Sequence, residues 1–176
     1  VGLLTEKVLS VDSNGGYSVE SRTTDMTVTA GGEVTKAEDQ PPTVDLYDRL
    51  GQLLEVKGKD RDSTDFRMEQ FQAIHYPDRP IKVGDTWDLS VRKKDGSLEV
   101  IGTCLVQGRE SSGGVDCFKL RTTMKEMRDK DPMSCDLTWW VSVQDGSQVK
   151  VDGIIKNMPI EGLGIADTKS TLVLQK

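Results

Sequence analysis

The chain has 176 residues, of which 35% are hydrophobic and 30% charged, and its net charge is −6. This length suffices for one domain with a substantial hydrophobic core or for two small domains. Lys and Arg are interleaved with Asp and Glu and form no basic patch, which argues against a nucleic-acid-binding protein. No apolar run approaches the roughly 18 residues that a transmembrane helix needs.

The first residue and the cysteines bear on the compartment. The chain begins with Val1 rather than Met, so we expect that an N-terminal segment has been removed. A secretory signal, a lipoprotein leader and a cloning boundary are the alternatives. There are three cysteines, Cys104, Cys117 and Cys135, and an odd number does not suggest a disulfide framework. One bridge with one free thiol and three buried reduced thiols both remain open.

Alternation of apolar and polar residues predicts β-strands along most of the chain. The apolar positions change parity within the second predicted strand, which indicates a bulge or bend in Ser21–Asp25. Gly-containing turns separate the strands and predict hairpins. In the first part of the chain, the predicted strands are Leu3–Asp12, Tyr17–Ala30, a short edge piece at Glu33–Ala37, Thr43–Asp48 and Gln52–Lys57.

One helix is predicted, over Ser63–Ile74. Met68, Phe71 and Ile74 recur every third residue, which gives this segment an apolar helical stripe. The helix is expected to end before Pro77, because the residue that precedes a proline is biased away from helical backbone angles.

The second part of the chain returns to strands. The apolar segment Asn157–Ala166 lacks strand periodicity, so it is predicted to be a loop that either packs on the sheet or acts as a lid. The predicted strands are Trp87–Arg92, Leu98–Gln107, Val115–Met127, Cys135–Val143, Gln148–Lys156 and Thr168–Leu174.

The two halves of the chain have similar orders of strands and glycine turns. We therefore predict one domain over 1–176 with pseudo-repeat halves, 1–58 and 87–176, joined by a helix and linker at 59–86. If the halves are repeats, the first half lacks an opening strand, whose place would be before Val1. A chance match of glycine turns is the alternative to a repeat. The predicted fold is mainly β: one curved antiparallel sheet, or half-barrel, of about nine or ten strands, with the helix on its concave face.

The segment between the halves carries a family resemblance. Pro77–Asp88 reads Pro-Asp-Arg-Pro-Ile-Lys-Val-Gly-Asp-Thr-Trp-Asp. It resembles the Pro-x-x-Pro-Val-x-Val-Gly-Asp-x-Trp segment of uncharacterised secreted and lipoprotein families of the bacterial envelope, with Ile81 in place of the usual Val. Asp48–Leu54 and the stretch from Trp139 to Lys150 continue the resemblance. It implies an exported protein, periplasmic or at the cell surface, with an architecture similar to the half-barrels of lipoprotein carriers, and it implies no catalytic residue.

The residues offer little for catalysis or metal binding. His75 is the single histidine and follows the predicted helix, where a capping or surface position explains it. A nucleophilic triad would have to use it, and no nucleophile motif accompanies it. There is no Cys-x-x-Cys pair for zinc, and the acidic clusters at 60–65 and 129–131 do not match a calcium loop. We therefore predict no enzyme, no metal and no cofactor.

Two apolar features favour a ligand: the apolar segment at Asn157–Ala166 and a pair of tryptophans. Trp139 and Trp140 are adjacent in one strand, so both faces of that strand carry a large aromatic side chain. One face is core, and the helix, a partner or a ligand covers the other. This leads to the hypothesis of a non-catalytic envelope protein that binds a hydrophobic small molecule or lipid in its concavity. The candidate lining residues are Phe71, Met124, Trp139, Trp140, Ile154, Met158, Ile160 and Leu163.

The alternative hypothesis is a structural or protein-interaction module that fills its own concavity and binds no small ligand. Such a module is expected to expose an apolar patch or an unpaired sheet edge. A partner protein or a second copy of the chain would bind through that edge.

Overall fold

The computed structural model describes residues 2–25, 27–30, 33–36, 39, 41–57, 68, 70–92, 98–160 and 164–173. Within these ranges, no helix is long and apolar enough to span a membrane. The chain divides into two compact units, Val1–Asp78 and Arg79–Lys176. The prediction of a mainly β, antiparallel fold is confirmed. The strands are distributed over a four-stranded sheet, a six-stranded sheet and a two-stranded ribbon, so the single sheet of the prediction is wrong.

Unit 1 contains the four-stranded sheet, in the order β1-β2-β5-β6, and the ribbon β3-β4. The prediction of a bend in Ser21–Asp25 is confirmed, since Asp25 has a φ of 53°. The prediction of one continuous strand over Tyr17–Ala30 is wrong, because the first strand ends at this bend. This left-handed angle is incompatible with a continuing strand, so the residues after it leave the sheet. The strands are β1 (Leu3–Val11), β2 (Tyr17–Thr24), β3 (Thr27–Ala30), β4 (Glu33–Lys36), β5 (Thr43–Tyr47) and β6 (Leu53–Lys57).

The β1–β2 and β5–β6 turns have the same geometry. In each turn one aspartate, Asp12 or Asp48, accepts hydrogen bonds from two backbone amides through Oδ1. The glycine three residues later, Gly15 or Gly51, has φ of 84° or 82°, which is favourable only for glycine. The Asp-x-x-Gly pattern therefore encodes both hairpins of the four-stranded sheet.

The predicted helix over Ser63–Ile74 is partly visible. Met68 and residues 70–72 are helical, whereas 58–67 and 69 lie outside the described residues. Phe71 is fully buried. The helical residues end before Pro77, as predicted.

The chain that follows the helical residues is fixed on the β5–β6 turn. The amide of Tyr76 donates to the carbonyl oxygen of Leu50 at 2.7 Å. Arg49 donates two hydrogen bonds to Asp78, at 2.8 and 2.5 Å. A Cβ atom on Gly51 would lie 2.2 Å from a carbonyl oxygen of this segment, so the close approach also requires glycine there.

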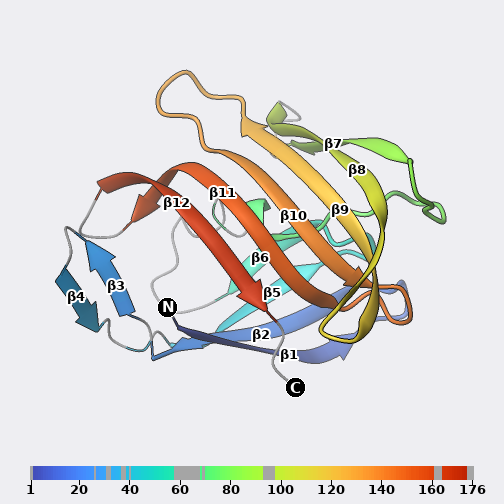
Figure 1. Cartoon of the computed structure of the whole chain (residues 1–176), viewed down its shortest axis with the longest axis horizontal. Coiled ribbons are helices and arrows are strands. Elements are labelled where there is room, and N and C mark those ends of the chain that lie inside the picture. The colour runs from blue at the N-terminus through green and yellow to red at the C-terminus, as the bar shows by residue number, and fades with distance from the viewer. Residues whose placement is uncertain are drawn as a thin grey trace. The chain divides into compact units, whose positions relative to one another are not determined.

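Unit 2 is a six-stranded antiparallel meander in which sequence neighbours are also neighbours in the sheet. Figure 1 shows its strands side by side as one twisted and strongly curved sheet. The strands are β7 (Thr86–Arg92), β8 (Leu98–Ser112), β9 (Val115–Glu126), β10 (Ser134–Ser142), β11 (Gln148–Ile160) and β12 (Gly164–Val173).

The prediction of a loop over Asn157–Ala166 is wrong. β11 continues to Ile160, and β12 begins at Gly164, so the described residues of this segment are paired strands, and 161–163 lie outside the described residues. The pairing register shifts between Ile155 and Met158, and Asn157 has a φ of 55°. This bulge changes which face the side chains point to, and the alternation in the sequence is therefore interrupted although the strand continues.

The six-stranded sheet has two distinct faces. On the face that we call the buried face, most apolar side chains are at most 6% exposed; these include Leu89, Val106, Leu120, Met124, Leu137, Trp139, Val151 and Ile155. Trp87 and Phe118 of the same face are half-buried. The opposite face, which we call the open face, carries cross-strand polar pairs. Arg121 of β9 donates to Asp136 of β10, and a hydrogen bond of 3.1 Å joins the hydroxyls of Thr103 and Thr123.

Strand glycines permit close approach of strands in this sheet. A Cβ atom on Gly102 of β8 would lie 2.2 Å from the carbonyl oxygen of Thr123 and 2.7 Å from Met124 Cγ. A Cβ atom on Gly153 of β11 would lie 2.2 Å from the carbonyl oxygen of Asp136. The backbones can therefore approach this closely only without side chains at these two positions.

Replacing Gly102 by Ala is expected to lower the free energy of unfolding by about 1–3 kcal/mol, because the added methyl group overlaps backbone atoms that cannot move freely. Gly108→Ala in the same strand is the matched control, since nothing lies within 4 Å of a Cβ atom there. Urea denaturation measures both variants. Equal stabilities for the two would contradict the close approach.

Candidate functional site

The predicted ligand-binding residues occupy different places in the fold. Met124 and Trp139 lie on the same buried face of the six-stranded sheet, four residues apart in register, while Phe71 is buried in unit 1. Trp140 and Ile154 lie on the open face, and Ile154 is exposed.

Two of the three further predicted positions, Met158 and Ile160, lie near the end of strand β11. Met158 is half-buried, and its Sδ atom lies 3.4 Å from Thr168 Oγ1. The Ile160 side chain and all of Leu163 lie outside the described residues. Among the described candidates of unit 2, therefore, only Met124 and Trp139 share a buried surface.

An open depression of about 480 Å³ lies over β7, β8 and β9. Its lining residues are Asp88, Leu89, Ser90, Arg92, Ile101, Gly102, Thr103 and Thr123, and none of them is a predicted ligand-binding residue. It is open to solvent, whereas sites for apolar ligands usually enclose most of the ligand surface.

Trp140 is the centre of a cluster on the open face. Lys119 of β9 and Lys150 of β11 lie directly opposite it in the two neighbouring strands. Their ammonium nitrogens are 5.2 Å and 4.4 Å from the ring centroid, within the range of cation–π attraction. Trp140 Nε1 donates to Glu110 Oε1 at 2.5 Å. Trp140 is only 9% exposed, so its own neighbours cover the aromatic surface.

Glu110 compensates one of the two lysine charges of the Trp140 cluster. The hydrogen bond from Trp140 lowers the pKa of Glu110, and the charges of Lys119 and Lys150 lower it further. Glu110 is therefore ionised at neutral pH and pairs with Lys119 at 3.4 Å. Sequence reasoning placed Trp140 on the face opposite Trp139, but it missed the two lysines, because only the pairing register reveals them.

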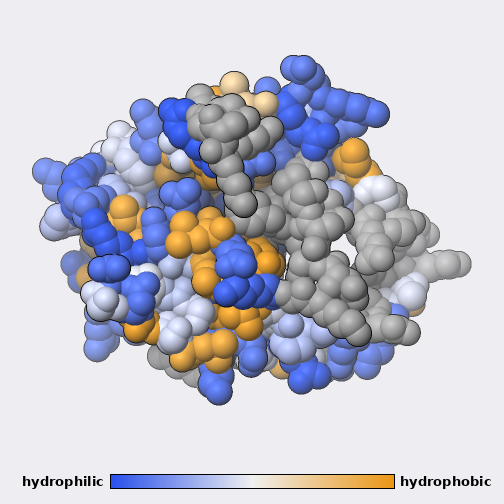
Figure 2. Space-filling model, turned by 180° about the vertical axis from the view of Figure 1, so that it is seen from behind, coloured by the Kyte–Doolittle hydropathy of each residue, from blue (hydrophilic) through white to orange (hydrophobic). Residues whose placement is uncertain are grey.

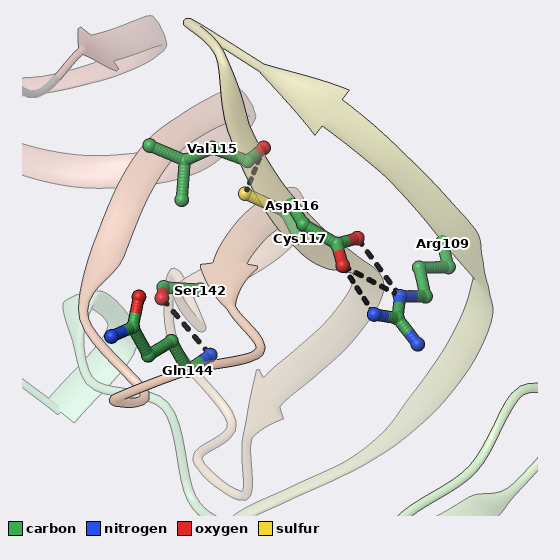
Figure 3. Close-up of polar contacts among 6 residues, drawn as sticks. All are labelled: Arg109, Val115, Asp116, Cys117, Ser142 and Gln144. Atoms are coloured by element: carbon green, nitrogen blue, oxygen red, sulfur yellow. Dashed lines mark hydrogen bonds and ion pairs between the residues drawn. The ribbon is translucent and has the colours of Figure 1, made fainter.

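The end of the sheet beside this cluster is fixed by local contacts, shown in Figure 3. Val115, Cys117 and Val149 pack with Trp140 in a small apolar group. Cys117 Sγ donates to the carbonyl oxygen of Val115 at 3.4 Å.

An ion pair and a turn contact complete this end of the sheet. Arg109 pairs with Asp116 across the β8–β9 hairpin, and the amide of Gln144 donates to Ser142 Oγ at 3.2 Å. These contacts fix the local geometry of this end of the sheet.

All three cysteines are buried and free, which decides between the alternatives that the sequence left open. Cys104 lies on the buried face, opposite Thr122, whereas Cys117 packs with the open-face residue Trp140. Burial raises the pKa of Cys104 to about 11 and that of Cys135 to about 12, and it also raises the pKa of Cys117. Protonated, buried thiols are poor nucleophiles and poor metal ligands.

His75 and the acidic clusters add no reactive centre. Burial lowers the pKa of His75 from its ordinary value, so its imidazole is neutral at pH 7. In the part of the chain that the structure describes, no group of three or more His, Cys, Asp or Glu residues could hold a metal ion. The acidic cluster at 60–65 lies outside the described residues, and the one at 129–131 is exposed.

A scan against family models and searches of curated proteins and of solved structures found no match to this chain. The resemblance of Pro77–Asp88 to bacterial envelope proteins therefore stays a prediction from the sequence motif.

The indole N–H signal of Trp140 is expected to report the ionisation of Glu110. Because the folded state lowers the pKa of Glu110, the hydrogen bond is present at neutral pH and is lost as pH falls through a value below 4.5. A nuclear magnetic resonance titration should show this signal moving in the native chain and not in Glu110→Gln. The Trp139 indole, which has no acceptor among the described residues, serves as the internal control. Identical titrations of the two indoles would contradict the assignment.

The three thiols are expected to resist labelling in the folded chain. At pH 8 a thiol with the pKa of Cys104, about 11, has roughly 100-fold less thiolate than one with the ordinary value of 9.0. Reaction with a chromogenic disulfide reagent should therefore be negligible in buffer and complete at all three cysteines in guanidinium chloride. Rapid labelling of one thiol in the native chain would show that its site is open.

Proposed function

We propose that this protein is a non-catalytic interaction module that binds an extended segment of a partner protein along strand β1. The observation that carries the proposal is the exposure of this edge. β1 ends the order of the four-stranded sheet, and all nine of its residues are exposed. The large apolar side chains among them are Leu3, Leu4, Val8, Leu9 and Val11, which are 46%, 37%, 59%, 45% and 66% exposed.

Edge strands of soluble proteins are usually short, charged or covered, because their free backbone groups invite pairing. β1 is long and apolar, and the bulge between Val8 and Ser10 is its main irregularity. Figure 2 shows hydrophobic patches at the surface of one side of the molecule, between hydrophilic side chains. An extended peptide that adds to such an edge gains backbone hydrogen bonds and buries alternate side chains.

The charges of β1 favour a partner other than a second copy. Glu6 and Lys7 are adjacent, so their side chains point to opposite faces of the sheet. In an antiparallel pairing of two β1 strands, opposite residues share a face, and Glu6 therefore cannot meet Lys7 of the other copy. Desolvation and the charge of Asp45 raise the pKa of Glu6. A partner strand with Lys or Arg opposite Glu6 and an acidic residue opposite Lys7 would satisfy both charges.

The non-catalytic role is part of the proposal, and the described candidates for a nucleophile or base are not activated. The described thiols are protonated, and His75 is neutral at pH 7. We further propose a location in the bacterial cell envelope, which rests on the Pro77–Asp88 motif alone. The competing hypothesis, a lipid carrier, would need an enclosed apolar cavity, and most apolar side chains of the buried face already have low exposure.

Val8→Lys is expected to weaken the binding of strand-adding peptides about tenfold, because it replaces an apolar contact on β1 by a charge. The peptides would be selected from a random nine-residue library displayed against the full chain, and calorimetry would measure their affinities. Val34→Lys is the matched control, since Val34 is 69% exposed in the ribbon and does not belong to β1.

Selected peptides should carry alternating apolar residues and a cation at the position opposite Glu6. Equal affinities for the two variants would refute binding at β1. Native mass spectrometry of the protein from its own host tests the competing hypothesis. A bound lipid that is lost on unfolding, together with no peptide selection, would replace the interaction module by a carrier.

A further inference from the structure

Strand β12 is the second long open edge, and its sequence has a symmetry that β1 lacks. β12 ends the order of the six-stranded sheet, so its outer side is paired with no other described strand. Its residues alternate regularly in exposure from Ile165 to Val173, with the odd-numbered side chains exposed on the open face. Asp167 and Lys169 are two residues apart and therefore share this face.

We propose that β12 pairs with β12 of a second copy of this chain, antiparallel and about a two-fold axis at Thr168. Such an axis places residues i and 336 − i opposite each other across the interface. Asp167 of each copy then faces Lys169 of the other, and Ile165 faces Thr171. The two six-stranded sheets become one continuous sheet.

The pairing satisfies the geometric rules for a symmetric sheet interface. A two-fold axis perpendicular to the sheet keeps each face on the same side, so opposite residues must have the same parity. Asp167 and Lys169 meet this condition, whereas Glu6 and Lys7 of β1 do not. The same patch serves both copies, which is the isologous arrangement of most dimers.

The charges also make the edge selective. A lysine in the middle of an edge strand normally discourages pairing with other strands. Lys169 does so here for any strand without an acidic residue opposite it, while a second copy supplies Asp167 at that position. The Asp167 carboxylate is already held in place, because its Oδ1 accepts a hydrogen bond from the amide of Asn157 at 3.1 Å. The inference does not depend on the proposed function, since β1 and β12 belong to different sheets.

Charge variants of the full chain test this interface by sedimentation velocity. The native chain is expected to dimerise at micromolar concentration, and Lys169→Asp to be monomeric, because two pairs of carboxylates then oppose each other. Lys125→Asp makes the same charge change on the open face of β9, three strands from the edge, and should leave the dimer intact.

Restoring the charge complementarity should restore the dimer. Asp167→Lys alone is expected to be monomeric, but a mixture of this variant with Lys169→Asp should form heterodimers. The double variant that carries both Asp167→Lys and Lys169→Asp should form homodimers. Circular dichroism checks that each variant is folded, and Lys169→Gln replaces Lys169→Asp if the latter is not.

A native chain that stays monomeric, a Lys169→Asp variant that still dimerises, or a mixture that fails to associate would each overturn the proposal. Loss of peptide binding at β1 in the earlier experiment would leave this result unaffected, so the two proposals fail separately.

Discussion

The register of pairing between β9, β10 and β11 is the constraint on which the rest of unit 2 depends. Because side chains alternate between faces, a slip of one residue in any of these strands would exchange the buried face for the open face. The present register puts Trp139 opposite Leu120 and Val151, all three buried. The same register puts Trp140 between two lysines. One set of hydrogen bonds thus fixes both the core and the cation-covered indole.

Much of the strand content follows from the sequence, since alternation and turn residues are local signals. The hairpins around Gly15 and Gly51 were predicted for this reason, and the structure has them. The sequence failed where a residue other than glycine takes a left-handed angle, at Asp25 and Asn157. The change of parity in Ser21–Asp25 did indicate a bend there, but it did not show that the strand ends. At Asn157 the interrupted alternation was interpreted as a loop, because a bulge inside a continuing strand interrupts the pattern in the same way. The separation of the β3–β4 ribbon from the four-stranded sheet follows from the first of these breaks.

The candidate site was predictable in part. Adjacent tryptophans in a strand must point to opposite faces, and the structure places Trp139 and Trp140 so. What covers Trp140 depends on residues about 10 and 21 positions away, and no pattern in the sequence alone brings Lys150 and Lys119 to its two sides. The placement of Asp167 and Lys169 on either side of Thr168, by contrast, can be seen in the sequence. It predicts an interface only once the structure shows that β12 is an edge strand.

The ribbon of β3 and β4 lies between β2 and β5 in the sequence, yet β2 and β5 pair directly with each other. The pairing of β2 with β5 therefore closes a loop that contains the ribbon, and the ribbon makes no backbone hydrogen bonds with the strands of the four-stranded sheet. Loop-closure entropy grows only slowly with length, by about 0.6 kcal/mol for each doubling. The ribbon is thus the place in unit 1 where evolution, or an engineer, can lengthen, shorten or exchange the chain at little expense to the sheet that carries it.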